Sequence, residues 1–432
     1  MADTPAFEIE ALKRDWVAGL SGEALYLSAC AYREQIELLT AVDRRRGVLL
    51  AESDPFKFAA VFFAALSLEV PIILANPKWG QLERAELAKL VAPALCFGLE
   101  MNDFSLNAPL PPRGAVLIPT GGSTGGVKLA IHNWESLSAA CRGVQAFLGG
   151  GPINSCCVLP LFHVSGLMQL LRSFMTGGRI FFDDSQVEGR CLSYVATQLQ
   201  RALSNPRRVV ELKTAKAIFV GGGPMSDSLV ERARAARLPV VPVYGMTETA
   251  AMVAAIPAAD LWTNPSAGAQ PIGDARLLIE DTGAIRIQSS ALFLGYQGQQ
   301  PVDLLEGYLT QDQGYLDADL GLHVVGRMDR IIISGGEKID LNEVESALRQ
   351  HFKLDEILAC GMPDEEWGQR LVVFYVLSED QAGLGNWRAQ LKLHLAHFKI
   401  PKQMIVVEAL PLDERGKLDR DRVRSILAEQ SL

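Results

Sequence analysis

Glycines, hydroxyls and a cation are concentrated at residues 119–128, in the stretch PTGGSTGGVK. Glycine leaves backbone N–H groups free to face an anion, and such groups bind phosphate. The side chains that could assist are Thr120, Ser123, Thr124 and Lys128. The stretch is not a Walker A loop, because Val127 precedes the lysine and Leu129 follows it, and it also lacks GxGxxG. The loop alone therefore leaves two alternatives: a phosphate-binding loop and an ordinary connection between a strand and a helix.

Four further stretches carry residues of the kinds that bind a nucleotide. YGMTETA at 244–250 contains an aromatic ring and one carboxylate, Glu248, and a carboxylate beside a triphosphate usually binds magnesium. GGGP at 221–224 would let a flat base approach the backbone, and Asp312 in YLTQDQGYLD could accept both ribose hydroxyls. DERGKLDR at 413–420 places Lys417 beside a glycine. Taken singly, each is explained as simply by a turn, a helix cap or a solvated loop.

The order of these motifs resembles that of the adenylate-forming superfamily, which includes acyl-CoA synthetases, peptide-synthetase adenylation domains and luciferases. The resemblance runs from about residue 115 to the C-terminus. It rests on the glycine loop followed by PLFHVSG, GGGP, YGMTET, TQDQG, GRMDRII, GGEKI and GKLDR. It implies that the glycine loop grips the pyrophosphate of ATP while a carboxylate attacks the α-phosphate. The acyl-adenylate so formed would then pass its acyl group to a thiol such as CoA.

The resemblance implies a role for individual residues. Those expected to bind ATP are Thr120, Ser123, Thr124, Lys128, Gly221, Gly222, Tyr244, Asp312 and Arg327. Those expected to act in catalysis are His163, Thr247, Glu248 and Lys417. Among these, Glu248 would bind Mg²⁺, and Lys417 would bridge the acyl carboxylate and the α-phosphate. The pattern of residues around His163 fits a core histidine equally well.

The resemblance also implies a mobile C-terminal domain. Asp329 would be its hinge, and Gly335 and Gly336 would line a tunnel for the pantetheine arm of CoA. Two residues depart from the family pattern: Val127 stands where proline is usual, and Gln311 where glycine is usual. The flanks of Lys417 keep the pattern, so we expect an active enzyme.

A single arginine interrupts the apolar helical pattern in PLFHVSGLMQLLRSF at 160–174. A buried arginine without an anion is costly, so Arg172 either extends to the surface or awaits a substrate carboxylate. This segment, VATQLQRAL at 195–203 and the variant loop GGSTGGVKLAIHNW are similar to the o-succinylbenzoate–CoA ligases of menaquinone and phylloquinone biosynthesis. That resemblance implies an aromatic dicarboxylic acid as substrate, with Arg172 holding the carboxylate that is not activated.

Three other functions stay open on the sequence. The protein could be another aryl- or acyl-CoA ligase, or an adenylation domain that loads a carrier protein. It could also be a catalytically silent nucleotide-binding regulator.

Short apolar runs flanked by glycine or proline alternate with helical segments, which predicts an α/β fold with sheets buried on both faces. Strands are expected at 48–50, 70–76, 115–119, 156–160, 217–223 and 240–245, with helices at 80–91 and 134–148. Short alternating strands follow residue 270, and a compact α+β unit follows residue 330. With the resemblance, this predicts a large N-terminal domain of stacked α/β subdomains and a small β-barrel-like part at 1–326. A hinge at 327–330 and a mobile C-terminal domain at 331–432 would follow.

Composition limits the function classes. A net charge of −9 argues against a nucleic-acid partner. The most apolar run, 58–68, is far shorter than the roughly 20 residues of a membrane-spanning helix, and the N-terminus lacks the apolar core of a signal peptide. The 7 cysteines show no metal-binding spacing and fit reduced thiols. We therefore expect a cytoplasmic enzyme, and its oligomeric state stays open, a homo-oligomer included.

Overall fold

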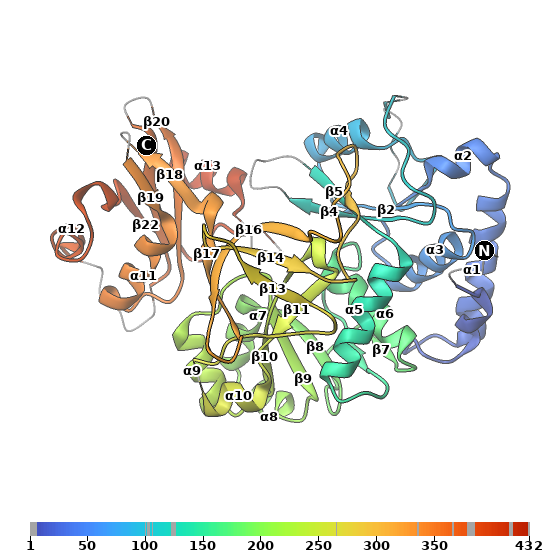
Figure 1. Ribbon diagram of the computed structural model, residues 1–432, viewed down its shortest axis with the longest axis horizontal. Helices are drawn as coiled ribbons and strands as arrows, with labels where there is room; N and C mark the ends of the chain where they lie inside the picture. Colours follow the sequence, from blue (N-terminus) through green and yellow to red (C-terminus); the bar gives the residue numbers. More distant parts are fainter. Residues whose placement is uncertain are drawn as a thin grey trace.

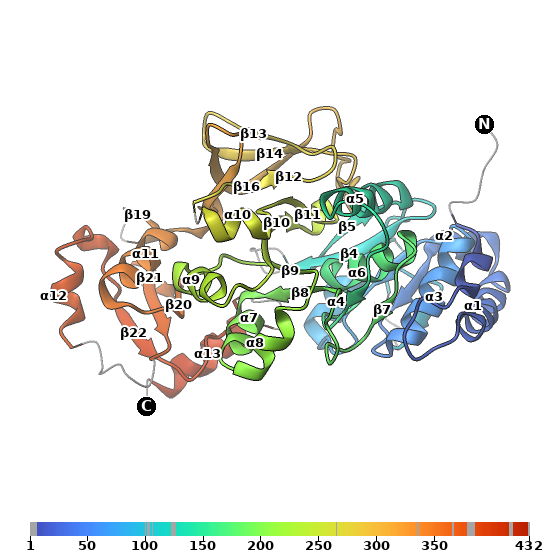
Figure 2. The same cartoon turned by 90° about the horizontal axis from the view of Figure 1, so that it is seen from below.

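The computed structural model describes residues 7–99, 101, 104–105, 107–121, 127–264, 266–334, 337–364, 367–377, 385–413 and 418–430. Two α/β sheets lie side by side, an antiparallel sheet covers one end of them, and a small C-terminal domain lies at the far end from the N-terminal helices (Figures 1 and 2). This arrangement confirms the predicted fold class.

The first sheet is buried on both faces. The residues of its central strands alternate: Leu49 and Ile73 pack towards α4 (Gln81–Leu90), while Val48 and Ile72 pack towards α3 (Pro55–Ser67). Most of the apolar run at 58–68 lies in α3, which begins at Pro55 because Asp54 caps it. The strand order is β15 (Gly295–Tyr296), β5 (Val127–His132), β4 (Val116–Gly121), β2 (Ile72–Leu74), β1 (Val48–Leu50) and β3 (Leu95–Phe97).

The second sheet has helices on both faces as well. On one face lie α5 (Trp134–Phe147) and α6 (Val164–Met175), and on the other α7 (Ala196–Leu203), α8 (Pro206–Leu212) and α9 (Asp227–Ala235). Its strand order is β12 (Gln270–Pro271), β11 (Ala251–Ala255), β10 (Val240–Met246), β9 (Ala217–Gly221), β8 (Cys191–Val195), β6 (Ser155–Cys156) and β7 (Ile180–Phe181). The strand predicted at 156–160 is shorter, because the chain turns at Pro160 into α6. Three N-terminal helices precede the first sheet in the sequence: η1 (Ile9–Lys13), α1 (Gly22–Glu37) and α2 (Ala41–Arg46). Helix α10 (Ala258–Thr263) follows β11.

The antiparallel sheet follows residue 270, where the sequence predicts short alternating strands. It consists of β13 (Arg276–Ile279), β14 (Ala284–Gln288), β16 (Tyr308–Leu316) and β17 (Leu322–Arg327), in that order. Strand β17 leads into the turn η3 (Met328–Arg330) and then into the C-terminal domain. The predicted hinge thus lies between two sheets, and its motion stays a prediction.

The C-terminal domain is a sheet covered by helices on two sides. Its strands β19 (Glu337–Asp340), β18 (Ile331–Ser334), β21 (Gly368–Tyr375) and β20 (Ile357–Asp364) are joined by β22 (Gln403–Val406), which pairs with β21. One face packs on α11 (Leu341–Phe352) and the other on α13 (Arg420–Glu429), while α12 (Trp387–Leu391) and η4 (His397–Lys399) precede β22. The domain contacts the second sheet unit through Gln200, whose Nε2 donates to Glu356 Oε1 at 2.7 Å.

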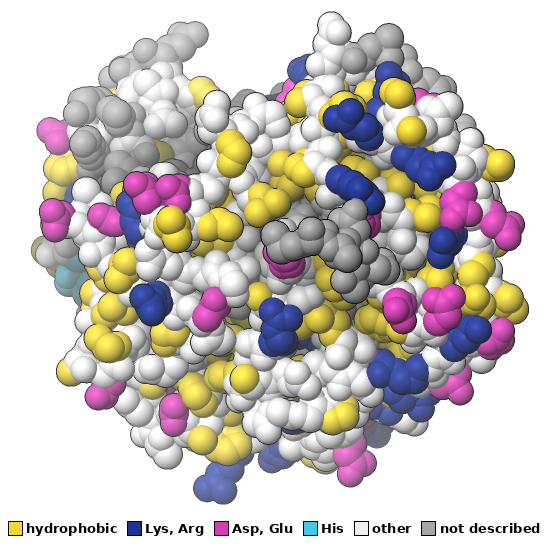
Figure 3. Space-filling view, turned by 45° about the vertical axis from the view of Figure 1, so that its right-hand side comes forward, with side chains coloured by type: hydrophobic (Ala, Val, Ile, Leu, Met, Phe, Trp, Pro, Cys, Tyr) yellow, Lys and Arg dark blue, Asp and Glu magenta, His cyan; other side chains and the backbone are white. Residues whose placement is uncertain are grey.

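Charges of both signs are interspersed over the described surface in Figure 3, so that face shows no extended basic area. Among the described residues, no helix has both the length and the apolar character needed to cross a bilayer.

Candidate active site

Two neighbouring parallel strands bring the predicted adenine-binding residues to one edge of the second sheet. Strands β9 and β10 pair with Val220 opposite Pro242, so Gly221 and Tyr244 both follow at the carboxyl ends of their strands. Both glycines suit their places. A Cβ on Gly221 would lie 2.6 Å from Val243 Cγ2, and Gly222 has φ of +83°, which favours glycine. Ligands of open α/β sheets bind at this kind of edge.

Tyr244, Asp312 and Arg327 form one hydrogen-bonded group. The hydroxyl of Tyr244 donates to Asp312 Oδ2 at 2.8 Å, and Nη1 of Arg327 lies 3.4 Å from Asp312 Oδ1. Asp312 and Arg327 are cross-strand partners on β16 and β17, and the Asp312 carboxylate is buried. Burial and the charge of Asp312 raise the pKa of Tyr244, so its hydroxyl stays protonated. Gln311, the departure from the family pattern, is exposed beside buried Asp312, because successive residues of a strand point to opposite faces.

Glu248 lies in the turn η2 (Thr247–Thr249), where its carboxylate is buried. The hydroxyl of Tyr296 donates to Glu248 Oε1, and the hydroxyl of Tyr308 lies 3.3 Å from that of Tyr296. Lys128 Nζ lies 5.4 Å from the centroid of the Tyr296 ring. The structure thus brings together the predicted pyrophosphate-binding lysine and the predicted magnesium ligand, with Tyr296 between them.

A magnesium ion fits this chemistry. A nucleotide-bound Mg²⁺ needs only one or two protein carboxylates, since phosphates and water complete its octahedron. Glu248 supplies one carboxylate oxygen that no described hydroxyl occupies, because the Tyr296 hydroxyl contacts only Oε1. The described residues contain no cluster of three metal-ligating side chains.

The sequence patterns gave no role to two residues of this site, Tyr296 and His132. His132 ends β5 and is fully buried, with Nε2 2.7 Å from the carbonyl oxygen of Thr247. It stands in AIHNW at 130–134, which follows the glycine loop in the sequence, and Tyr296 stands in LGYQG at 294–298. The position of a histidine shortly after the glycine loop was the signal in the sequence that could have indicated a role for His132.

Arg172 is buried, with 3% of its surface exposed, so it does not extend to the surface. Its Nε donates to the Met168 carbonyl at 2.9 Å, Nη1 lies 3.8 Å from Met252 Sδ, and Cζ lies 5.5 Å from the centroid of the Phe219 ring. Met252 pairs across the sheet with Gly245, the residue after Tyr244. The guanidinium therefore lies one strand away from the predicted adenine-binding residues.

The charge of Arg172 is not balanced by an acidic side chain within the described part of the chain. The ionisable groups that act electrostatically on Arg172 are thiols. Burial raises the pKa of Cys141 and Cys157 to about 12 and that of Cys191 to about 11. These thiols are neutral at physiological pH, so they do not compensate the cation. Burial lowers the pKa of Arg172 itself, as expected for a cation removed from water.

Known protein families match this chain in two consecutive segments. The family described as AMP-binding enzyme matches residues 102–296, and that described as AMP-binding enzyme C-terminal domain matches residues 343–417. A 2-succinylbenzoate–CoA ligase from Enterococcus faecalis is 32% identical over 334 residues, which cover 71% of this chain and 68% of that relative. The chain belongs to the AMP-binding enzyme family. It is therefore an adenylate-forming ligase.

Solved structures share the fold over nearly the whole length of this chain. An o-succinylbenzoate CoA synthetase from Bacillus subtilis, in complex with the acyl-adenylate OSB-AMP, superposes with a TM-score of 0.72 and 23% identity, covering 94% of both chains. The same protein is also known in complex with ATP and a magnesium ion. An amide bond synthetase from Marinactinospora thermotolerans gives a TM-score of 0.75 at 19% identity, covering 96% of this chain and 98% of that one.

Five predicted site residues lie outside the described residues: Ser123 and Thr124 of the glycine loop, Gly335 and Gly336 of the predicted CoA tunnel, and the predicted catalytic Lys417. The glycine loop joins β4 to β5, with Thr120 paired with Lys128, so its ends form an antiparallel hairpin. The strand-to-helix connection that was one alternative is therefore wrong. His163 is the residue directly before α6, the helix that carries Arg172, and its side chain makes no capping hydrogen bond to that helix. It is partly buried, with its ring 4.5 Å from that of Phe162. Asp329 lies in η3.

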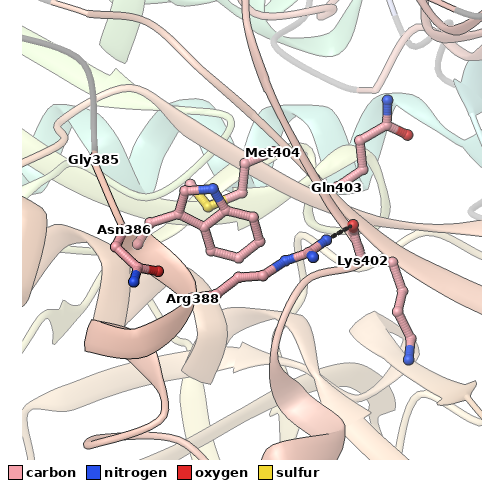
Figure 4. A pocket seen from close by; sticks show the side chains of 7 residues that line it. Gly385, Asn386, Arg388, Lys402, Gln403 and Met404 are labelled. Carbon is pink, nitrogen blue, oxygen red and sulfur yellow. Dashed lines mark hydrogen bonds between the residues drawn. The ribbon is translucent and has the colours of Figure 1, made fainter.

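A surface pocket of about 340 Å³ lies elsewhere, between α12 and β22 of the C-terminal domain (Figure 4). Arg388 crosses it and donates to the Lys402 carbonyl at 2.6 Å. None of the predicted ATP-binding residues lines it, so this pocket is not the nucleotide site.

Proposed function

We propose that this protein activates o-succinylbenzoate with ATP and Mg²⁺ to an acyl-adenylate and transfers the acyl group to CoA, as a step of menaquinone or phylloquinone biosynthesis. The proposal rests mainly on Arg172, a buried guanidinium without a described acidic partner, one strand away from the residues proposed to bind adenine. A substrate with two carboxylates supplies the missing anion. The Enterococcus faecalis relative, named as a ligase for this acid, supports the same substrate.

The proposed residues divide the chemistry between binding and charge stabilisation. Lys128 and the glycine loop would hold the β- and γ-phosphates, and Glu248 would hold the magnesium ion that screens the two anions as they meet. Tyr244, Asp312 and Arg327 would fix the nucleoside. Arg172 would hold the second carboxylate of the acid at a distance from the reacting one, so that only one carboxylate reaches the α-phosphate.

The second half of the reaction would need the C-terminal domain to move. We infer that Lys417 completes adenylate formation, and that rotation about Asp329 then brings Gly335 and Gly336 to the thiol channel beside His163. An acyl-adenylate hydrolyses readily, so the domain would also exclude water until CoA arrives.

A screen of carboxylic acids with ATP and CoA tests this function. Product thioester is measured with o-succinylbenzoate and with two monocarboxylic analogues, 4-oxo-4-phenylbutanoate and 2-butanoylbenzoate, each of which lacks one of the two carboxylates. We expect kcat/KM to be highest for o-succinylbenzoate by at least about tenfold, because a charge-assisted contact contributes roughly 1.5–3 kcal/mol. A higher kcat/KM for a monocarboxylic acid would contradict the proposal, and transfer only to a carrier protein would favour a carrier-loading domain.

A further inference from the structure

His132 joins two parts of the site that are far apart in the sequence. Its Nε2 lies 2.7 Å from the Thr247 carbonyl oxygen, and its Nδ1 lies 3.0 Å from Ser136 Oγ. A carbonyl can only accept, so Nε2 carries the proton. In the neutral ring Nδ1 is then an acceptor, and it shares the single proton of the Ser136 hydroxyl with the Asn133 carbonyl, which lies 3.1 Å from Ser136 Oγ. Ser136 stands in the first turn of α5 and fixes the ring from its other side.

The imidazole is uncharged under physiological conditions. It is fully buried, and burial lowers the pKa of His132 to about 4. A neutral ring with its proton held on Nε2 is a fixed hydrogen-bond donor rather than a proton carrier.

The turn that His132 holds is strained. Directly after η2, Ala250 and Ala251 have φ of 49° and 80°, in the left-handed region that residues other than glycine rarely adopt. Such a conformation persists only when its surroundings hold it. Thr249 Oγ1 donates to the Ala251 carbonyl at 2.7 Å, and the Phe293 N–H donates to the Glu248 carbonyl at 2.9 Å. His132 supplies the corresponding hydrogen bond at Thr247, the first residue of the turn.

The same strand carries the phosphate-binding lysine. Lys128 and His132 are four residues apart on β5, and residues an even number apart lie on one face of a strand. The hydrogen bond from His132 therefore ties the strand that presents Lys128 to the turn that presents Thr247 and Glu248.

We propose that His132 is a positioning residue for adenylate formation: its Nε2–H holds the Thr247 carbonyl and so sets the Thr247 hydroxyl and the Glu248 carboxylate at a fixed place relative to Lys128. This inference rests on the proposed function, because these three groups are the ones assigned to the phosphates and magnesium ion. His132 does not itself touch substrate; it acts through the turn.

Two amide substitutions separate this role from a merely structural one. In His132→Gln, the side-chain amide reaches about as far as Nε2 and can still donate to Thr247. In His132→Asn, the amide reaches only about as far as Nδ1, so the contact with Ser136 can survive and the contact with Thr247 is lost. Both variants replace a buried ring with a smaller amide, so their melting temperatures report the shared cost of packing.

Two measurements are made on the full chain: acid-dependent ATP–pyrophosphate exchange, and binding of ATP with Mg²⁺ by titration calorimetry. We expect His132→Asn to lower kcat of exchange by at least about tenfold relative to His132→Gln, and to bind ATP several-fold more weakly, at similar melting temperatures. Thioester formation from supplied acyl-adenylate should differ less between the two, since the β- and γ-phosphates have left by then.

Equal exchange rates and equal ATP affinities in the two variants would overturn the positioning role, as would losses that follow only the melting temperature. The wild type could also fail to catalyse pyrophosphate exchange with any of the acids tested. A difference in ATP affinity between the two variants would then keep the positioning role and reject the proposed function. The two claims can therefore fail separately.

Discussion

The hydroxyl of Tyr244 donates a 2.8 Å hydrogen bond to the carboxylate of Asp312, and this bond joins the end of β10 to the middle of β16. The second sheet and the antiparallel sheet thus meet at the proposed nucleoside site. Tyr244, the proposed adenine contact, and Asp312, the proposed ribose contact, therefore hold each other in position through this hydrogen bond.

This bond predicts the effect of removing one hydroxyl. Tyr244→Phe keeps the ring and frees Asp312 from its neutral donor, so we expect KM for ATP to rise by about threefold to tenfold with little change in kcat. Tyr315→Phe is the control, because Tyr315 is 53% exposed and stacks on His323 outside the site. An unchanged KM in Tyr244→Phe would remove Asp312 from the nucleoside site.

Glu248→Gln tests the magnesium ligand. A neutral amide is a weaker ligand than a carboxylate for a hard cation, so we expect the Mg²⁺ concentration for half-maximal pyrophosphate exchange to rise by about tenfold. Glu280→Gln is the matched control, since Glu280 pairs with Arg286 on the antiparallel sheet. If both variants give the wild-type magnesium titration, Glu248 is not a magnesium ligand and has only a structural role in the turn η2.

His132 predicts a dependence of stability on pH. Its pKa is about 4 in the folded protein and about 6.5 when unfolded, so between these values the unfolded chain binds the extra proton. Stability from this residue is therefore complete above about pH 6.5 and is lost as the pH falls towards 4. Between pH 7 and 5 the loss is about 2 kcal/mol in the free energy of unfolding.

Urea unfolding at both pH values measures this loss in the wild type and in His132→Gln. The pH-dependent loss should shrink in the variant, which has no group to protonate at this position. An identical loss in both proteins would mean that other groups cause it.

Lys417 lies outside the described residues, and its role stays a prediction. Lys417→Ala should abolish acid-dependent pyrophosphate exchange but spare thioester formation from supplied acyl-adenylate, because its charge is needed only where the carboxylate meets the α-phosphate. Lys402→Ala is a control in the same domain, since Lys402 Nζ lies 3.6 Å from the centroid of the Trp367 ring. If Lys417→Ala lost both half-reactions equally, Lys417 would not act in adenylate formation alone, and the prediction would be wrong.

Local sequence patterns predict much of the fold because they reflect local physics. The apolar runs at 48–50, 217–223 and 240–245 correspond to β1, β9 and β10, since a strand buried on both faces must be apolar throughout. The helix predicted at 134–148 is α5, and Asn133 caps it.

The contacts of the site are less predictable because they cross long stretches of chain. His132 and Thr247 are 115 residues apart, and Glu248 and Tyr296 are 48 apart, so no local spacing relates them. Arg172 shows the same limit in another way. Its pattern fitted both an exposed and a buried side chain, and only the packing of α6 against Phe219 and Met252 decides between them.

Arg172→Met separates the function of this arginine from its effect on folding. Replacing an uncompensated buried cation by an apolar side chain of similar length should leave the melting temperature unchanged or raise it. Arg142→Met is the matched control, because Arg142 is exposed on α5 beside Cys141. A lower melting temperature in Arg172→Met alone would show that the guanidinium stabilises the fold.

The most direct test of the account is the ratio of kcat/KM for o-succinylbenzoate to kcat/KM for 4-oxo-4-phenylbutanoate, and the same ratio with 2-butanoylbenzoate, in wild type and Arg172→Met. If Arg172 binds the second carboxylate, the ratio for the analogue that lacks that carboxylate should fall by about tenfold to a hundredfold in the variant. Activity with that monocarboxylic acid should change little or rise, because no unpaired guanidinium then faces it. If the variant loses activity with all three acids in equal proportion, Arg172 does not recognise a carboxylate, and the dicarboxylic substrate is contradicted.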